Sequence, residues 1–538
     1  SVAVKGRFLK TSSNKRLHSK SAQADVALGS DAGYVRLYGD YRDVGNYQDG
    51  DGQTVSSAFR SLNGGVLLTG DVFEFTRMEA NLELTRDRNI LYAGSGMDAP
   101  LADASIWRFK VQHEAPVGIL DEQAVNLYFS EVTHQMDNYT VRLRKPGNPN
   151  GMRTPSDSKV VGGRWLGTVF LERAEWHIGF DARSSQQNAE RFQVNRTSQA
   201  QSLKSVVWPG VEQRQWGLFS ELDYRFSAVD RVWVGGRYDD LDAKATKAHV
   251  STLGNDSPDA LYKKYYGTDA RSARDHNVSA LISWQHGLGD ASSGYRQYLE
   301  FRGSRSVRST DATERFIAAR GSCCHGSDDW VGNPLIKPEQ HYQLDAGYHF
   351  QKGRAQLSTV VYLDEVSDYI IRYYSASGAL LYRNTGARIY GADLEVEYPL
   401  GRFKPSGSLS WTRGVNRDPS GPHDENLPQI PALLARFALE YESGSWRLGG
   451  RCELAASQDK VNLASGQDQG ESPGFDVWHL YGAWQMTPEV RLQGGVDNLF
   501  DRTYAWHVSR GNVDPLSPGA VRVNEPGRLL WLGVGVVF

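Results

Sequence analysis

The segment from Glu122 to Arg144 (EQAVNLYFSEVTHQMDNYTVRLR) alternates apolar and polar side chains over an unusual length. Successive residues of a β-strand point to opposite faces, so Val125, Leu127 and Phe129 share one face. The other face is mostly polar and carries Asn126, Tyr128, Ser130, Val132, His134, Met136 and Asn138. About 9–11 residues of strand cross the hydrocarbon of a membrane, and this segment continues well past that length. The pattern predicts a strand of a transmembrane β-barrel that protrudes from an outer membrane.

Short turn-like connections alternate with long polar segments along the whole chain. The short connections are residues 29–33, 70–74, 116–122, 172–176, 226–231, 286–295, 351–354, 399–403, 442–446 and 486–490. The long segments are roughly residues 11–20, 43–62, 86–106, 145–159, 184–212, 239–275, 306–341, 369–386, 413–430, 456–475 and 505–527. This alternation predicts an all-β, 22-stranded antiparallel transmembrane barrel over residues 1–538, with short periplasmic turns and long extracellular loops.

The composition agrees with a membrane barrel and excludes other classes. The counts of 60 basic and 63 acidic residues argue against a nucleic-acid partner. The 26 tyrosines and 14 tryptophans suit the aromatic girdles at the two faces of a lipid bilayer. We find no apolar run long enough for a transmembrane helix, no signal peptide at Ser1, and no repeat of fixed length that a β-propeller or solenoid requires. No catalytic motif is present, so we expect no enzyme activity.

His134 and Met136 are candidate metal ligands on the polar face of the first segment. They are two residues apart, so both side chains point to the same side of the strand, toward the lumen. A thioether is a soft ligand that selects Cu(I), while imidazole accepts Cu(I), Cu(II) or Zn²⁺. Two donors are too few for a tight site, so further ligands must come from elsewhere. A chance His-x-Met pair with no metal is the alternative.

A second candidate metal site lies in the predicted loop SCCHGSDD. Cys323, Cys324 and His325 could ligate a soft metal, followed closely by Asp328 and Asp329. Adjacent cysteines do not both point easily at one ion, and in an oxidising location they form a strained vicinal disulfide or stay unused.

Three further sulfur-containing residues are weaker candidates. Met78 and Met97 could line an access path for a soft ion, although a scattered methionine more often serves packing. Cys452 lies in a predicted strand and is expected to be a small packed residue.

Several segments resemble conserved parts of a known family. Asn333–Tyr348 (NPLIKPEQHYQLDAGY), Asn384–Tyr398 (NTGARIYGADLEVEY), Asp497–Tyr504 (DNLFDRTY) and the ending PGRLLWLGVGVVF are similar to barrel segments of the TonB-dependent receptors. Earlier in the chain, RNILYAGSGMDAP (residues 88–100) and VTHQMDNY (residues 132–139) resemble the copper receptors of the OprC/NosA type within that family.

The resemblance implies an outer-membrane receptor that takes up copper with energy from the TonB complex. In the copper receptors a His-x-Met pair on a barrel strand binds the metal together with a Cys-x-x-x-Met pair of an N-terminal plug domain. The matching barrel residues here are His134 and Met136, with copper, as Cu(I), the implied ligand.

No Cys-x-x-x-Met occurs in this chain, which begins with what reads as a first strand. We therefore expect residues 1–538 to be the barrel portion of a receptor, with plug and TonB box outside them. A receptor for a siderophore or other metal chelate is a second possibility, and a passive pore or surface binding protein is a third.

Overall fold

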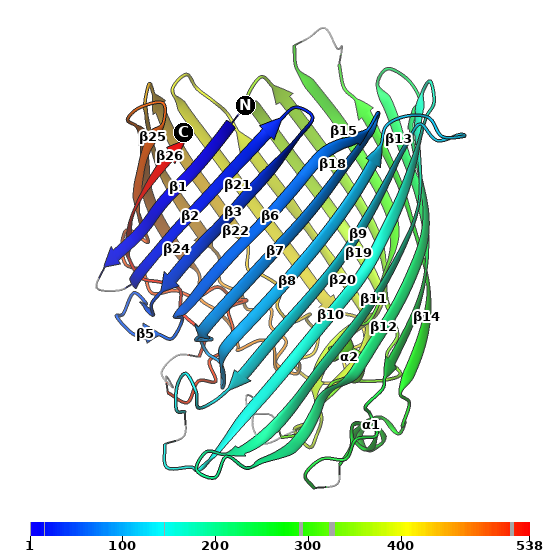
Figure 1. Ribbon diagram of the computed structural model, residues 1–538, viewed down its shortest axis with the longest axis vertical. Helices are drawn as coiled ribbons and strands as arrows, with labels where there is room; N and C mark the ends of the chain where they lie inside the picture. The colour runs from blue at the N-terminus through cyan, green and yellow to red at the C-terminus, as the bar shows by residue number, and fades with distance from the viewer. Residues whose placement is uncertain are drawn as a thin grey trace.

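The structure is a computed structural model that describes residues 2–14, 17–144, 146–254, 256–289, 294–321, 329–516 and 521–537, with side chains from residue 18 onward. Long tilted strands dominate it and form one continuous sheet (Figure 1). Both chain ends lie at the upper end of the molecule in this view, and α1 lies at the lower end.

Within the described residues the sheet contains 22 long strands and the two-residue strands β16 and β17. The first eleven long strands are β1 (Val2–Asn14), β2 (Leu17–Ser30), β3 (Gly33–Val44), β6 (Phe59–Phe73), β7 (Thr76–Ile90), β8 (Asp98–His113), β9 (Glu122–Asp137), β10 (Asn150–Phe170), β11 (Ala174–Asn195), β12 (Gln201–Arg225) and β13 (Asp230–Ala245). The other eleven are β14 (Ser272–Gly287), β15 (Arg296–Arg308), β18 (Glu339–Lys352), β19 (Ala355–Tyr374), β20 (Leu380–Glu397), β21 (Phe403–Asn416), β22 (Leu434–Ser443), β23 (Trp446–Ala455), β24 (Phe475–Gln485), β25 (Val490–Asp497) and β26 (Leu529–Val537).

Each long strand pairs antiparallel with its neighbours in chain order, and β1 also pairs with β26, where Gly6 lies opposite Val536. This pairing joins the first strand to the last, so the backbone groups of both edges find partners inside the sheet. The predicted 22-stranded antiparallel barrel is confirmed.

Several predicted boundaries are wrong, all at the long-loop end. Strands β11 and β12 run through most of the predicted loop 184–212 and leave only a short turn between Asn195 and Gln201. The predicted loop 11–20 is mostly strand as well, because β1 extends to Asn14 and β2 begins at Leu17. Conversely, β9 ends at Asp137, so the predicted strand up to Arg144 is too long. Beyond the lipid both faces of a strand contact water, so hydrophobic alternation no longer marks where a strand ends.

Two helices and two small strand pairs lie within the long loops. The helices are α1 (Pro258–Tyr266) and α2 (Ala312–Phe316), and the short strands are β4 (Tyr47–Gln48), β5 (Thr54–Val55), β16 (Ala318–Ala319) and β17 (Trp330–Val331). Helix α1 ends at Gly267, whose φ of 71° is the left-handed conformation that glycine adopts easily. Neither helix of the described chain is long and apolar enough to cross a membrane.

The most buried apolar side chains lie at the long-loop end. There α1 and α2 pack against β12, and the fully buried Tyr262 donates a hydrogen bond of 2.6 Å to the carbonyl oxygen of Phe316. By contrast, Trp107, Leu127 and Val161 are 52%, 49% and 54% exposed in neighbouring strands and share one face. Exposed apolar side chains in register mark this face as the one turned to lipid, so the opposite face lines the lumen.

Candidate metal site and surrounding loops

His134 and Met136 lie on the lumen face of β9, opposite to the face that carries Leu127. Across the sheet, His134 lies between Ala102 of β8 and Ser156 of β10. Both side chains are partly buried. They lie near the last residue of β9, at the long-loop end of the barrel. The structure therefore brings an imidazole and a thioether together on the wall of the lumen, as the alternation predicts.

Tyr92 contacts the imidazole of His134 from the loop between β7 and β8. Its hydroxyl lies 3.3 Å from Nε2 of His134, and the two rings meet edge to face with centroids 6.2 Å apart. Burial raises the pKa of Tyr92, and the carboxylates of Asp87 and Asp98 add to the shift, so the hydroxyl keeps its proton at neutral pH. The contact orients the imidazole ring through Nε2 and does not involve Nδ1.

Sequence reasoning missed Tyr92 as a member of the site. It lies 42 residues before His134 and reaches it only because the β7–β8 loop folds back over β9. The one available signal was its position inside RNILYAGSGMDAP, a segment that resembles the copper receptors.

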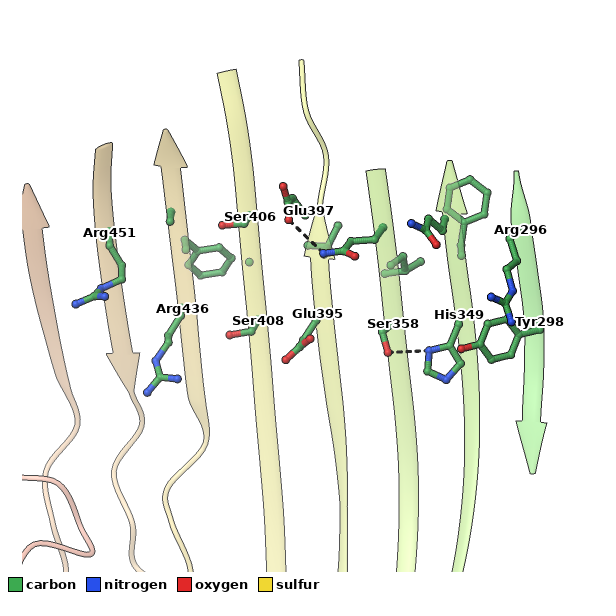
Figure 2. Close-up of a pocket in the computed structure, with 18 residues that line it drawn as sticks. Arg296, Tyr298, His349, Ser358, Glu395, Glu397, Ser406, Ser408, Arg436 and Arg451 are labelled. Carbon is green, nitrogen blue, oxygen red and sulfur yellow. Dashed lines mark hydrogen bonds between the residues drawn. The ribbon is translucent and has the colours of Figure 1, made fainter. Parts of the chain in front are cut away.

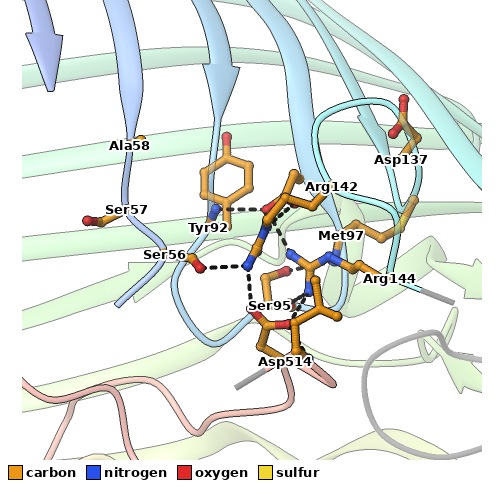
Figure 3. Close-up of polar contacts among 12 residues, drawn as sticks. Ser56, Ser57, Ala58, Tyr92, Ser95, Met97, Asp137, Arg142, Arg144 and Asp514 are labelled. Carbon is orange, nitrogen blue, oxygen red and sulfur yellow. Dashed lines mark hydrogen bonds and ion pairs between the residues drawn. The ribbon is translucent and has the colours of Figure 1, made fainter. Parts of the chain in front are cut away.

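A buried network of ion pairs holds this loop in place (Figure 3). Arg144 contacts Asp98 at 2.7 Å and Asp514 at 3.0 Å, and the side chains of all three are 1% exposed. Arg142 contacts the same two carboxylates at 2.8 Å and 2.9 Å and donates a hydrogen bond of 2.6 Å to Ser56. Two arginines thus share two buried aspartates, an arrangement in which each charge is compensated by its neighbours.

The network connects three long loops with the start of β8, and these segments lie far apart in the sequence. Its members come from the β3–β6, β9–β10 and β25–β26 connections and include Asp98, the first residue of β8. Arg142 and Asp514 are 372 residues apart. The backbone N–H of Tyr92 donates to Oδ1 of Asp98 at 3.2 Å. The position of Tyr92 over His134 therefore depends on the same buried carboxylate that pairs with both arginines.

The second predicted metal site cannot be placed, because Cys323, Cys324, His325 and Asp328 lie outside the described residues. Asp329 is described, and its carboxylate accepts hydrogen bonds from Tyr265 at 2.7 Å and Lys264 at 3.2 Å. It is thus held by α1. Across the described part of the chain, no group of three or more His, Cys, Asp or Glu side chains could hold a metal ion.

The two other methionines do not line an access path, and packing was the other role considered for them. Met78 lies on the outward face of β7 in an apolar groove with Val35 and Leu68, so it faces lipid. Met97 is only 3% exposed and precedes Asp98 of the buried network, which makes it a packing residue. Cys452 is 6% exposed within β23, as expected for a small packed residue.

Polar side chains of the lumen wall surround a hollow of about 490 Å³ that extends from β15 to β23 (Figure 2). Arg296 is the first residue of β15 and Glu397 the last of β20, so this hollow lies toward the short-turn end. It is therefore distant along the strands from His134, which lies at the long-loop end.

A second hollow of about 820 Å³ lies along β10 to β15 and contains several arginines. Arg237 pairs with Asp181 at 2.7 Å, and Arg302 pairs with Glu300 at 2.6 Å. Carboxylates of the wall itself compensate the charges of Arg237 and Arg302.

Comparison with known families decides the class of this barrel. Residues 19–499 match the family model described as TonB dependent receptor-like, beta-barrel. The chain belongs to the TonB-dependent receptors. It is thus an outer-membrane protein, and its lumen is that of a receptor barrel.

Among solved structures, this TonB-dependent receptor is similar to the copper transporter OprC. The TM-score is 0.86 at 28% sequence identity, and the match covers 100% of this chain and 80% of that one. Two curated relatives match more weakly. The chain is 21% identical over 299 residues to the ferrienterobactin receptor of Escherichia coli (strain K12) and 21% identical over 289 residues to the vitamin B12 transporter BtuB of Vibrio vulnificus (strain YJ016). These matches take in 50% and 52% of this chain and only 39% and 44% of the relatives.

Proposed function

We propose that this receptor takes up copper and binds it as Cu(I) through His134 and Met136. The proposal is supported mainly by one observation. An imidazole and a thioether lie on the same lumen face of β9, at the end nearest the external loops. A thioether is a soft donor that favours Cu(I) over Zn²⁺ and over the hard divalent cations. Because the Tyr92 hydroxyl contacts Nε2, Nδ1 of His134 would be the nitrogen available to copper, and the phenol would fix the orientation of the ring.

The similarity to the copper transporter OprC over the whole chain supports this reading. Two protein donors leave a copper ion under-coordinated, so the proposal includes further ligands from a plug domain outside this chain. Uptake would draw its energy from the TonB complex, as in other members of the family.

A receptor for an iron chelate or another large ligand is the second candidate. The matches to the ferrienterobactin receptor and the vitamin B12 transporter favour it. Such a ligand would need a lumen surface for its charged groups, and Arg237 and Arg302 of the larger hollow are already paired with carboxylates. These two arginines are therefore less available to an anionic chelate.

Metal analysis of the purified receptor tests the proposal. The receptor together with its plug domain is offered Cu(I) under reducing conditions, Zn²⁺, a ferric siderophore or cobalamin in separate samples, and the bound ligand is quantified after desalting. We expect about one copper per chain and no retention of the other three, because only Cu(I) matches a thioether–imidazole pair. Retention of the siderophore or cobalamin with no copper would instead support the chelate receptor, and retention of none would support a passive pore.

A further inference from the structure

The outward face of the barrel carries an apolar groove across β14, β15, β18 and β19. Its volume is about 600 Å³, and Ile282, Leu344 and Val361 line it with exposed fractions of 56%, 63% and 53%. The groove exists because Gly303 and Ala346, which also line it, are too small to fill the space between these side chains. Its dimensions and apolar lining suit a hydrocarbon chain.

Arg305 lies beyond one end of this groove and is not among the residues that line it. It follows Gly303 by two residues, so both point to the same face of β15. Strand β15 runs from the short-turn end to the long-loop end, which puts Arg305 on the external side of the groove.

The guanidinium of Arg305 is held by neutral groups. It donates to Oε1 of Gln340 at 2.7 Å, to the hydroxyl of Tyr342 at 3.4 Å and to the carbonyl oxygen of Val278, and it lies 5.8 Å from the centre of the Tyr342 ring. Within the described residues no carboxylate forms an ion pair with it. Other arginines of the same outward face do have acidic partners, such as Arg274 with Asp240 and Arg388 with Glu365.

We propose that this surface binds a phosphate-bearing lipid of the outer leaflet, with an acyl chain in the groove and its phosphate on Arg305. Three contacts engage three of the five N–H donors of the guanidinium, so two remain for anionic oxygens. An uncompensated cation beyond the external end of an apolar groove is complementary to an amphiphile with an anionic head. A barrel surface that only contacts the membrane interior requires neither the groove nor the uncompensated cation.

Native mass spectrometry of the full chain in detergent tests the site, with lipid A as the probe in its bisphosphorylated form and without phosphates. We expect one retained lipid, bound about tenfold more tightly when phosphorylated, because charge-assisted hydrogen bonds to phosphate are lost without it. Arg305→Gln should remove the preference for phosphate. Gly303→Leu should weaken both forms about tenfold by filling the groove.

Two matched variants serve as controls, and the groove variant is compatible with folding. A Cβ at Gly303 would lie 3.5 Å from Leu344 and 3.7 Å from Ile282, which is ordinary contact. Gly236→Leu adds the same bulk to the outward face of β13, where nothing lies within 4 Å of the new Cβ. Arg388→Gln removes a cation that Glu365 already compensates. Both controls should bind the two lipids as the unaltered chain does.

Three results would overturn the proposal. One is an Arg305→Gln variant that keeps the full phosphate preference. Another is a Gly236→Leu variant that loses as much lipid as Gly303→Leu. The third is a dimeric receptor that Gly303→Leu converts to a monomer, since a second copy of the chain would then fill the groove.

Discussion

The His134→Ala/Met136→Ala double variant is expected to bind Cu(I) at least about 100-fold more weakly than the unaltered chain, because both protein donors on β9 are lost together. Each side chain is only partly buried and lines the lumen, so neither replacement opens a cavity in a packed core. The barrel should therefore fold normally. Titration against a competing Cu(I) chelator under reducing conditions measures the change.

A double variant with the same residue types on the other face provides the control. Met78 and His276 lie on the outward faces of β7 and β14, so Met78→Ala/His276→Ala removes one thioether and one imidazole that cannot reach the lumen. We expect its Cu(I) affinity to equal that of the unaltered chain. If both double variants lose affinity equally, copper is bound nonspecifically and the site on β9 is not the ligand set.

Replacing Asp98 by alanine is expected to release the loops that surround the candidate metal site, at a cost of about 3–5 kcal/mol of local stability. Asp98 is 1% exposed and pairs with both Arg142 and Arg144, so its removal leaves two cations short of a partner, one of them fully buried. It also removes the acceptor for the backbone N–H of Tyr92. Hydrogen exchange should accelerate in peptides that contain residues 91–97, 138–144 and 505–516.

The exposed pair of Arg88 and Asp103 provides the matched control for this variant. Its side chains are 42% and 40% exposed, and a pair of this kind contributes only about 0–1 kcal/mol. Asp103→Ala should leave the exchange of the three loops unchanged. If Asp98→Ala exchanges no faster than Asp103→Ala, the buried network does not hold the loops together.

The barrel could be predicted wherever one face of a strand meets lipid. In β9 the side chains of Val125, Leu127 and Phe129 face the membrane, so an apolar residue recurs at every second position. At the external end of β11, Ser184, Gln186 and Asn188 occupy the corresponding face in water, and the alternation disappears although the strand continues. The predicted strand ends are therefore wrong where strands extend into water beyond the membrane, and the errors do not fall within the membrane.

The two loop helices were missed although local signals for them exist. Helix α1 begins with Pro258 after Ser257 and ends at Gly267, and α2 follows Asp311, whose side chain accepts a hydrogen bond from the N–H of Glu314. Both are standard helix boundaries.

The candidate site could be predicted only in part. His134 and Met136 share a face because they are two residues apart, which requires no knowledge of the rest of the fold. The contact of Tyr92 with His134 and the pairing of Arg142 with Asp514 depend on how separate external loops pack on one another. A pattern within one segment contains no information about such contacts.

X-ray absorption at the copper edge identifies the atoms bound to the metal, so it tests whether His134 and Met136 are copper ligands. The receptor is loaded with Cu(I) and compared with its Met136→Leu variant, which removes the thioether and nearly preserves the side-chain volume. We expect sulfur and imidazole nitrogen around copper in the unaltered receptor, and a smaller sulfur contribution in the variant. Copper bound without sulfur in the unaltered receptor, or an identical spectrum for the variant, would contradict this expectation.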